Sequence, residues 1–160
     1  MALMGVDIGI HKLALACFGI EYHPDSWSVD PELPRAAQLH HLASYAHDLA
    51  GLMGIDVVWI EDTLVGNNVK YSIALAETKG AVMAALSDYD VRLVNVGTWK
   101  KQVVGAGNAN KDAVRDYIHV THPAYAPLCG DDQDRYDATC IGLYGLQIME
   151  RAEGLRLAPG

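Results

Sequence analysis

The sequence has 160 residues, 51% of them hydrophobic and 20% charged, as expected of one globular domain with an ordinary core. Its formal net charge of −8 argues at first sight against a nucleic-acid-binding protein. No apolar run approaches the roughly 18–20 residues of a membrane span, and the N-terminal MALMGVDIG lacks the basic segment of a signal peptide. Three cysteines without CxxC spacing predict reduced thiols and a cytoplasmic protein.

Apolar patterning predicts strands and helices in a regular order. We expect, in chain order, strands at 3–7, 13–20 and 27–29, a helix from DPELPR to Gly51–Gly54, a strand at 55–60, a helix from Asn67 or Asn68 to Leu86, a strand at 91–94, short helices at 97–103 and 110–120, and a long helix at 132–151. The second helix is expected to bury Ile73, Ala76, Gly80 and Met83, and HPAYAPLCGDD reads as irregular. This order predicts one α/β domain with a mixed sheet at residues 1–153, followed by a tail at 154–160.

The charges are distributed unevenly along the chain. Residues 1–62 hold nine acids and two bases, whereas residues 70–115 hold seven bases and four acids. The middle of the chain is therefore locally positive, as a phosphate-binding surface would be, although ordinary solvent-exposed side chains would give the same count.

Four acidic residues stand where carboxylates can converge. Asp7 in GVDIG and Glu61 in VVWIED each close an apolar run that reads as a buried strand, and ligand sites of α/β sheets gather at the carboxyl ends of strands. Asp134 and Asp137, in DDQDRYDATCIGLYG, share one face of the last helix. These four residues are therefore the candidates for a common site.

Capping of the last helix is the competing explanation for the acids at its start, because an acid in the first turn suits the helix dipole. We expect Asp131 and Asp132 to have that role. Capping would explain Asp134 as well as metal binding does, whereas Asp137 borders the apolar face of the helix and is expected to point toward the sheet.

The four carboxylates together predict a divalent-metal site. Converging carboxylates repel one another unless a cation lies between them, and oxygen-only ligands favour Mg²⁺ or Mn²⁺ over zinc. Two such ions, about 3.5–4 Å apart, activate a water and stabilise a leaving 3′ oxygen. A nearby lysine would offset charge in the transition state. This pattern predicts a nuclease that hydrolyses a phosphodiester.

Five motifs, in order, resemble the RuvC-type Holliday-junction resolvases of the RNase H-like superfamily. They are GVDIG with the first acid, IED with the second, NNVKYSIALAETKGAVMAAL with the Ser, Leu and basic-Gly positions of a family helix, WKKQVVGAGNANKDAV with the lysine and Val-Val-Gly-x-Gly signature, and DRYDATCIGLYG with the closing D-x-x-D pair. The resemblance covers most of the chain. It implies an RNase H-like fold, a five-stranded mixed sheet flanked by helices.

The resemblance also implies the ligands and the reaction. Asp7, Glu61, Asp134 and Asp137 become the metal ligands of a site with two Mg²⁺ ions, for which Mn²⁺ can substitute. The expected activity is cleavage of Holliday junctions or other branched DNA, leaving 5′-phosphate and 3′-hydroxyl ends. Because two strands must be cut symmetrically about the branch, a homodimer is expected.

Basic and glycine positions of the fourth motif are expected to meet the substrate. The two family lysines fall on Lys100 and Lys111, of which Lys111 is expected to assist catalysis. Lys100 and Lys101 are expected to contact backbone phosphate. Gly105 and Gly107 would allow the backbone to approach DNA closely, or would simply form a turn between helices.

One departure from the family pattern leaves the substrate open. Leu64 stands three residues after the second acid, where family members often have a stacking aromatic residue. An aliphatic wedge remains feasible, but a less selective nuclease for forks, flaps or replication intermediates is an alternative. A non-catalytic branched-DNA-binding protein is another, although the complete set of four acids argues against it. DIG also resembles the start of actin-like ATPases, which would bind ATP.

Overall fold

The computed structural model describes residues 1–62 and 66–157. Its elements are, in chain order, β1 (Leu3–Ile8), β2 (Lys12–Phe18), β3 (Tyr22–Ser28), α1 (Arg35–Leu52), β4 (Val57–Asp62), α2 (Val69–Ala85), β5 (Asp90–Asn95), α3 (Val96–Trp99), the π-helical segment η1 (Lys100–Val104), α4 (Lys111–Thr121), α5 (Ala126–Cys129) and α6 (Gln133–Leu157). No helix in these two ranges has both the length and the apolarity to cross a membrane. Cys17, Cys129 and Cys140 are buried free thiols, as predicted.

The strands form one five-stranded sheet in the order β3-β2-β1-β4-β5. β1, β2 and β3 pair antiparallel, because a short turn joins β1 to β2, where the Gly9 N–H bonds to the Lys12 carbonyl at 2.8 Å. β4 and β5 run parallel to β1, because α1 and α2 supply the crossovers that parallel pairing needs. The predicted five-stranded mixed sheet is confirmed.

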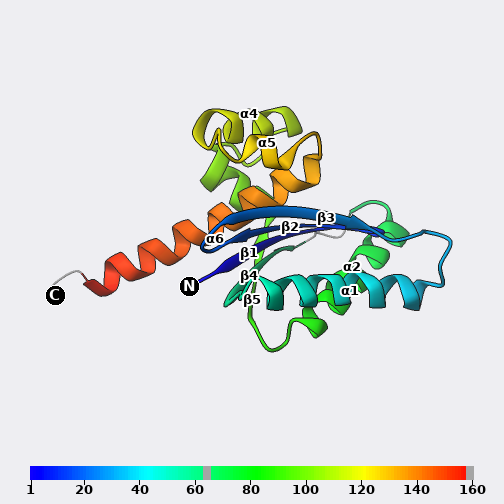
Figure 1. The fold of residues 1–160 in the computed structure, drawn as a ribbon. Coiled ribbons are helices and arrows are strands. Elements are labelled where there is room, and N and C mark those ends of the chain that lie inside the picture. The colour runs from blue at the N-terminus through cyan, green and yellow to red at the C-terminus, as the bar shows by residue number, and fades with distance from the viewer. Residues whose placement is uncertain (63–65, 158–160) are drawn as a thin grey trace.

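Helices cover both faces of the sheet (Figure 1). One core joins α1 and α2 to Met4, Val6 and Ile8 of β1, together with residues of β2 and β4. The other joins α6 and the α3–α5 region to Leu3 of β1, again with residues of β2 and β4. The C-terminal part of α6 extends past the sheet (Figure 1). Side chains of a strand alternate between these two cores.

Glycines allow α6 to lie directly on β1. A Cβ on Gly5 would lie 2.2 Å from the Ala138 carbonyl oxygen and 2.4 Å from the Gly142 nitrogen. On the helix side, a Cβ on Gly142 would lie 2.2 Å from the Phe18 ring. Because backbone meets backbone at Gly5, the residue beside Ala138, which is Asp137, is brought close to the end of β1.

The buried face of α2 differs from the prediction. Ile73 is 55% exposed, and Ala76 and Gly80 are exposed as well, whereas Leu75, Thr78 and Val82 are buried. Met83 alone of the four predicted residues is partly buried and packs against the core. The helix is apolar on more than one side, so residue spacing alone could not select the face. The face that packs on α1 joins its core through Leu75 and Val82, and the Arg35 guanidinium of α1 bonds to the Ala74 carbonyl at 2.7 Å and to Thr78 Oγ1 at 2.8 Å.

Three element boundaries also differ. The third strand begins at Tyr22 and not near residue 27, because this half-exposed edge strand pairs with β2 and tolerates Pro24. The segment expected to be irregular contains the single-turn helix α5. The last helix does not end at residue 151 but continues to Leu157, so residue 154 falls inside α6. The sequence offers no proline before Pro159 to stop it.

Candidate functional site

The strand acids lie side by side beneath the start of α6. Asp7 follows Leu3 and Gly5 on the face of β1 that α6 covers, and Glu61 follows Val57 and Trp59 on the same face of β4. Since β1 and β4 are parallel, with Val6 opposite Ile60, the two acids occupy neighbouring carboxyl ends. Both side chains are half-buried.

The two acids of α6 complete a group of four interacting carboxyls. Burial raises the pKa of Asp7 well above its usual range, and the charges of Asp137, Glu61 and Asp134 raise it further. Burial also raises the pKa of Glu61 and of Asp137, and Asp137 acts on Glu61 while Asp134 acts on Asp137. The tertiary structure therefore brings all four predicted acids into one electrostatic environment.

Three side chains that the sequence patterns did not predict as site residues bind these acids through hydrogen bonds or an ion pair. The Trp99 indole Nε1 donates to Glu61 Oε2 at 2.7 Å, and Gln133 Nε2 donates to Asp137 Oδ1 at 3.0 Å. Lys12 Nζ lies 2.9 Å from Asp134 Oδ2. Their only sequence signals were position: Trp99 directly precedes the lysine signature, Gln133 lies one helical turn before Asp137, and Lys12 ends the first hairpin turn.

The donor chemistry of the site fits a divalent cation. Its four carboxylates supply oxygen ligands only, and their mutual repulsion, which adds to burial in raising the pKa of Asp7, is what a bound cation would relieve. Within residues 1–62 and 66–157, no three His, Cys, Asp or Glu side chains are already arranged to hold one metal ion. A cation would therefore have to draw the side chains together, and the metal site remains a prediction.

Both family lysines lie close to the acids. Lys100 Nζ bonds to the Ala109 carbonyl at 2.9 Å, and its charge lowers the pKa of Glu61 and of Asp137. Lys111 is the exposed first residue of α4, which Asn110 caps, and its charge also acts on Asp137. Lys100, which was expected only to contact phosphate, thus also stabilises the ionised acids electrostatically. Its contact with phosphate remains a prediction.

The other residues predicted to contact DNA differ in their exposure and in their structural roles. Lys101 is exposed and lines a cleft with Thr98 and Arg151. Gly105 ends η1 with a φ of 104°, which favours glycine, and a Cβ on Gly107 would lie 3.1 Å from the Gly97 carbonyl oxygen. Both glycines therefore have a structural role, and their DNA contact stays a prediction. Leu64 lies outside the described residues.

The helix-capping prediction is half correct. Asp132 Oδ1 accepts the Asp134 backbone N–H at 3.1 Å, so Asp132 caps the start of α6 as expected. Asp131 instead contacts Arg115 Nη2 at 3.4 Å. The reason is tertiary: α4 lies beside the segment that precedes α6, where its arginine reaches the exposed carboxylate.

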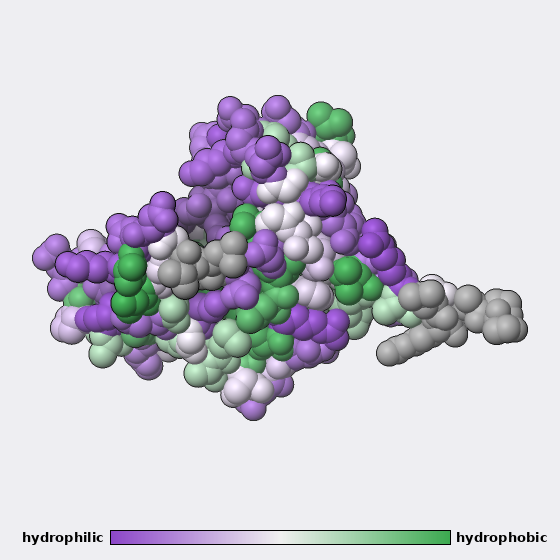
Figure 2. All heavy atoms as spheres, turned by 180° about the vertical axis from the view of Figure 1, so that it is seen from behind, coloured by the Kyte–Doolittle hydropathy of each residue, from purple (hydrophilic) through white to green (hydrophobic). Residues whose placement is uncertain are grey.

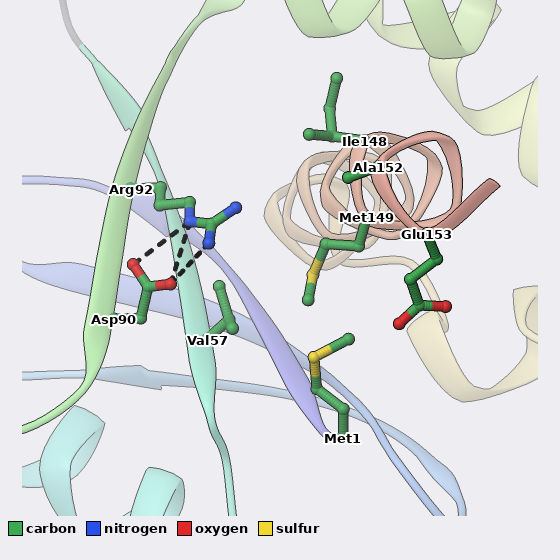
Figure 3. Close-up of a pocket in the computed structure, with 8 residues that line it drawn as sticks. All are labelled: Met1, Val57, Asp90, Arg92, Ile148, Met149, Ala152 and Glu153. Carbon is green, nitrogen blue, oxygen red and sulfur yellow. Dashed lines mark hydrogen bonds and ion pairs between the residues drawn. The ribbon is translucent and has the colours of Figure 1, made fainter. Parts of the chain in front are cut away.

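A separate hollow lies at the other end of the sheet. It is lined by Met1, Val57, the Asp90–Arg92 ion pair and the C-terminal part of α6, as Figure 3 shows. None of the four acids lines it. β4 and β5 are parallel, with Val57 beside Asp90 and Glu61 beside Val94, so this hollow and the acid group lie at opposite ends of the same strands.

Comparison with known proteins identifies the family. The family model described as crossover junction endodeoxyribonuclease RuvC matches residues 23–122. The chain belongs to the RuvC family. The matched range contains Glu61, Lys100 and Lys111, whereas Asp7, Asp134 and Asp137 lie outside it and are joined to it by the geometry described above.

Relatives within the RuvC family cover most of the chain. The crossover junction endodeoxyribonuclease RuvC of Rickettsia bellii is 26% identical over 141 residues, which are 83% of this chain and 90% of the relative. That of Hyphomonas neptunium is 33% identical over 110 residues, 66% of each chain. As a member of this family, the protein is an endodeoxyribonuclease.

Solved RuvC structures share the fold. Thermus thermophilus RuvC superposes with a TM-score of 0.78 at 17% identity, covering 95% of this chain and 97% of that one. The same protein in complex with a Holliday junction substrate superposes with a TM-score of 0.77 at 18% sequence identity, over 90% of this chain and 92% of that one. The yeast mitochondrial Holliday junction resolvase Ydc2 superposes with a TM-score of 0.62 at 10% sequence identity, over 89% of this chain and 77% of that one. The predicted RNase H-like architecture is thus confirmed.

Proposed function

We propose that this protein is a metal-dependent, structure-specific endonuclease that resolves Holliday junctions or related branched DNA. The observation that carries the proposal is the position of Asp7 and Glu61, which end neighbouring parallel strands beneath Asp134 and Asp137 of α6. Family membership supports the nuclease class, and the Holliday junction substrate held in the Thermus thermophilus complex supports a four-way junction.

The proposed ligands are the four acids, and two Mg²⁺ ions are the proposed cofactor, with Mn²⁺ as a substitute. When bound, such ions lower the pKa of a water and neutralise charge on the leaving 3′ oxygen. Trp99 and Gln133 orient Glu61 and Asp137 through the hydrogen bonds described above. By resemblance to the family, the proposed hydrolysis leaves a 5′-phosphate and a 3′-hydroxyl.

The proposed role of the lysines follows from their charge and exposure. Lys111 is exposed and its charge acts on Asp137, so its ammonium can approach the scissile phosphate and offset transition-state charge. Lys100 and Lys101 would neutralise flanking phosphates, with the backbone at Gly105 and Gly107 approaching the strand. Figure 2 shows a mostly hydrophilic surface over the α4–α5 helices, the region that begins at Lys111.

A homodimer is part of the proposal, because symmetric cleavage of two strands requires two active sites. The exposed apolar face of α2 supports it. Val69 is 60% and Ile73 is 55% exposed, and the small residues Ala76 and Gly80 continue the same face at helical spacing. Small residues along such a face would allow a second copy to approach closely.

The decisive experiment is Mg²⁺-dependent cleavage of a mobile four-way DNA junction, with fork, flap and linear duplex of matched sequence beside it and the product ends mapped. Preferential, paired cuts in the junction are expected, with none in Asp7→Asn or Asp137→Asn protein. Equal cutting of the linear duplex would overturn the resolvase while keeping the nuclease. Preference for forks or flaps would favour the less selective enzyme that Leu64 suggests. Tight junction binding without any cleavage would favour a non-catalytic binder.

A further inference from the structure

Lys12 joins two acids at the start of α6. Its Nζ lies 2.7 and 2.8 Å from the two carboxylate oxygens of Asp132 and 2.9 Å from Asp134 Oδ2. It therefore pairs at once with the residue that caps α6 and with one of the four candidate metal ligands. Lys12 is the first residue of β2, 120 residues from Asp132 in the sequence, so only the fold makes this contact.

Asp132, which holds the Lys12 ammonium, is itself fixed by several hydrogen bonds. Asp132 Oδ2 also accepts a 2.7 Å hydrogen bond from Ser26 Oγ on β3, and Asp132 Oδ1 accepts the Asp134 backbone N–H. Arg135 Nε bonds in turn to Ser26 Oγ at 3.1 Å. Asp132 thus anchors Lys12 independently of Asp134, and the lysine would stay near the site if Asp134 bound something else.

Asp134 itself remains accessible. Its side chain is 42% exposed, against 22% for Asp132 and 32% for Lys12. Lys12 contacts one of its two oxygens, Oδ2. A divalent ion that approached Asp134 would therefore meet a carboxylate whose charge the Lys12 ammonium partly compensates, and would be repelled by that ammonium at short range.

We propose that Lys12 is a built-in counter-cation for Asp134 that competes with a divalent metal ion for this carboxylate. The inference rests on the proposed function, because it takes Asp134 as a metal ligand. In the free protein, an ion held by Asp7, Glu61 and Asp137 would then be bound more tightly than an ion that needs Asp134. Lys12 is a positioning residue in this scheme, because it acts through Asp134 and not on the substrate.

The test is Mn²⁺ binding to the full-length protein without DNA, measured by calorimetry and by the electron paramagnetic resonance of free Mn²⁺. The variants are Lys12→Met, Lys12→Arg, Asp134→Asn and the Lys12→Met/Asp134→Asn double variant. Arg92→Met is the matched control, because it removes a cation from the 2.6 Å ion pair with Asp90 at the opposite end of the sheet. Circular dichroism verifies that each variant is folded.

Lys12→Met is expected to tighten the weaker class of Mn²⁺ sites by about tenfold or more, since a unit charge a few ångströms away is removed. Lys12→Arg and Arg92→Met should bind Mn²⁺ as the unaltered protein does. Asp134→Asn, which leaves Lys12 anchored to Asp132, should lose the weaker class and keep the tighter one. The double variant should then behave like Asp134→Asn alone.

Two results would overturn the inference. One is an unchanged binding isotherm in folded Lys12→Met protein, which would make the ion pair purely structural. The other is tightening that persists in the double variant, which would mean that Lys12 acts on a carboxylate other than Asp134. Other results would contradict the proposed metal-dependent function itself. In that case the unaltered protein would bind no Mn²⁺, or Asp7→Asn protein would bind Mn²⁺ as tightly as the unaltered protein.

Discussion

The indole Nε1 of Trp99 donates a 2.7 Å hydrogen bond to Oε2 of Glu61. Trp99 is fully buried, and the ammonium of the next residue, Lys100, lies 5.5 Å from its ring centroid. One ring therefore fixes the second acid and supports the first lysine of the family signature. The bond also lowers the pKa of Glu61 against the effect of burial, and so favours the ionised form that a metal needs.

Replacement of Trp99 by phenylalanine should weaken metal use. The change removes a hydrogen bond to a carboxylate, an interaction worth about 1.5–3 kcal/mol, and leaves a small cavity. Cleavage should then require roughly tenfold more Mg²⁺ for half-maximal rate, which a Mg²⁺ titration of junction cleavage measures. Trp59→Phe is the matched control, because Trp59 Nε1 is buried without a partner among the described residues. An equal shift in both variants would contradict the role of the Trp99 bond.

Asp7→Asn should abolish cleavage and yet stabilise the metal-free protein. The raised pKa of Asp7 reflects burial beside three other carboxyls, so the neutral amide removes an unfavourable charge at neutral pH. Thermal unfolding in EDTA should show a higher midpoint, by about 2–4 °C for each kcal/mol relieved. A lower midpoint would indicate that Asp7 stabilises the fold through contacts of its own.

The metal-free protein should lose stability as the pH rises through the acid range. The pKa values of Asp7, Glu61 and Asp137 are raised from ordinary values of 3.8, 4.5 and 3.8. The folded chain therefore keeps protons that the unfolded chain has lost, so the free energy of unfolding falls from about pH 4 until the raised values are passed. Urea unfolding in EDTA across this range measures the fall.

Two controls accompany the pH series. Saturating Mg²⁺ should remove much of the fall, because the cation compensates the same charges, and Asp7→Asn should flatten it. Asp132 behaves oppositely: its lowered pKa stabilises the fold above 3.8, and that contribution is lost only as the pH falls further. Identical profiles with and without Mg²⁺ would contradict metal binding by these acids.

Gly5→Ala should damage the fold far more than an ordinary glycine replacement. The new Cβ would lie 2.2 Å from a backbone oxygen of α6, so the helix must move away from β1. A loss of about 3 kcal/mol or more in urea unfolding is expected, as for severe overpacking. Gly154→Ala, where nothing lies within 4 Å of the Cβ, should be neutral or slightly stabilising. Comparable losses in both would refute the close approach.

Ile73→Glu should dissociate the proposed dimer. The substitution places a charge on the exposed apolar face of α2, where a second copy would have to bury it. Light scattering coupled to size exclusion should then report the monomer mass at concentrations where the unaltered protein is dimeric. Leu128→Glu on α5, at a side chain 51% exposed, is the matched control and should leave the mass unchanged. A dimer that survives Ile73→Glu would exclude this face.

Local patterns were sufficient for most of the elements and for the four acids. Apolar runs closed by Asp7 and Glu61 predict β1 and β4 with their acids at the ends, because strand formation and burial follow from neighbouring residues. The hairpin of β1 and β2 and the cap of α2 at Asn68 follow from equally local signals. The D-x-x-D spacing likewise places Asp134 and Asp137 on one helix face, whatever surrounds them.

Contacts between distant segments were decided only by the tertiary structure. The buried face of α2 was set by its packing against α1, because the helix is apolar on more than one side. Trp99 and Glu61 are 38 residues apart, and Lys12 and Asp132 are 120 apart. Such pairs depend on strand register and on where α6 lies against the sheet, which no local pattern encodes. The sequence by itself therefore determined which acids are candidates for the site, and the fold brought them together and decided which side chains orient and neutralise them.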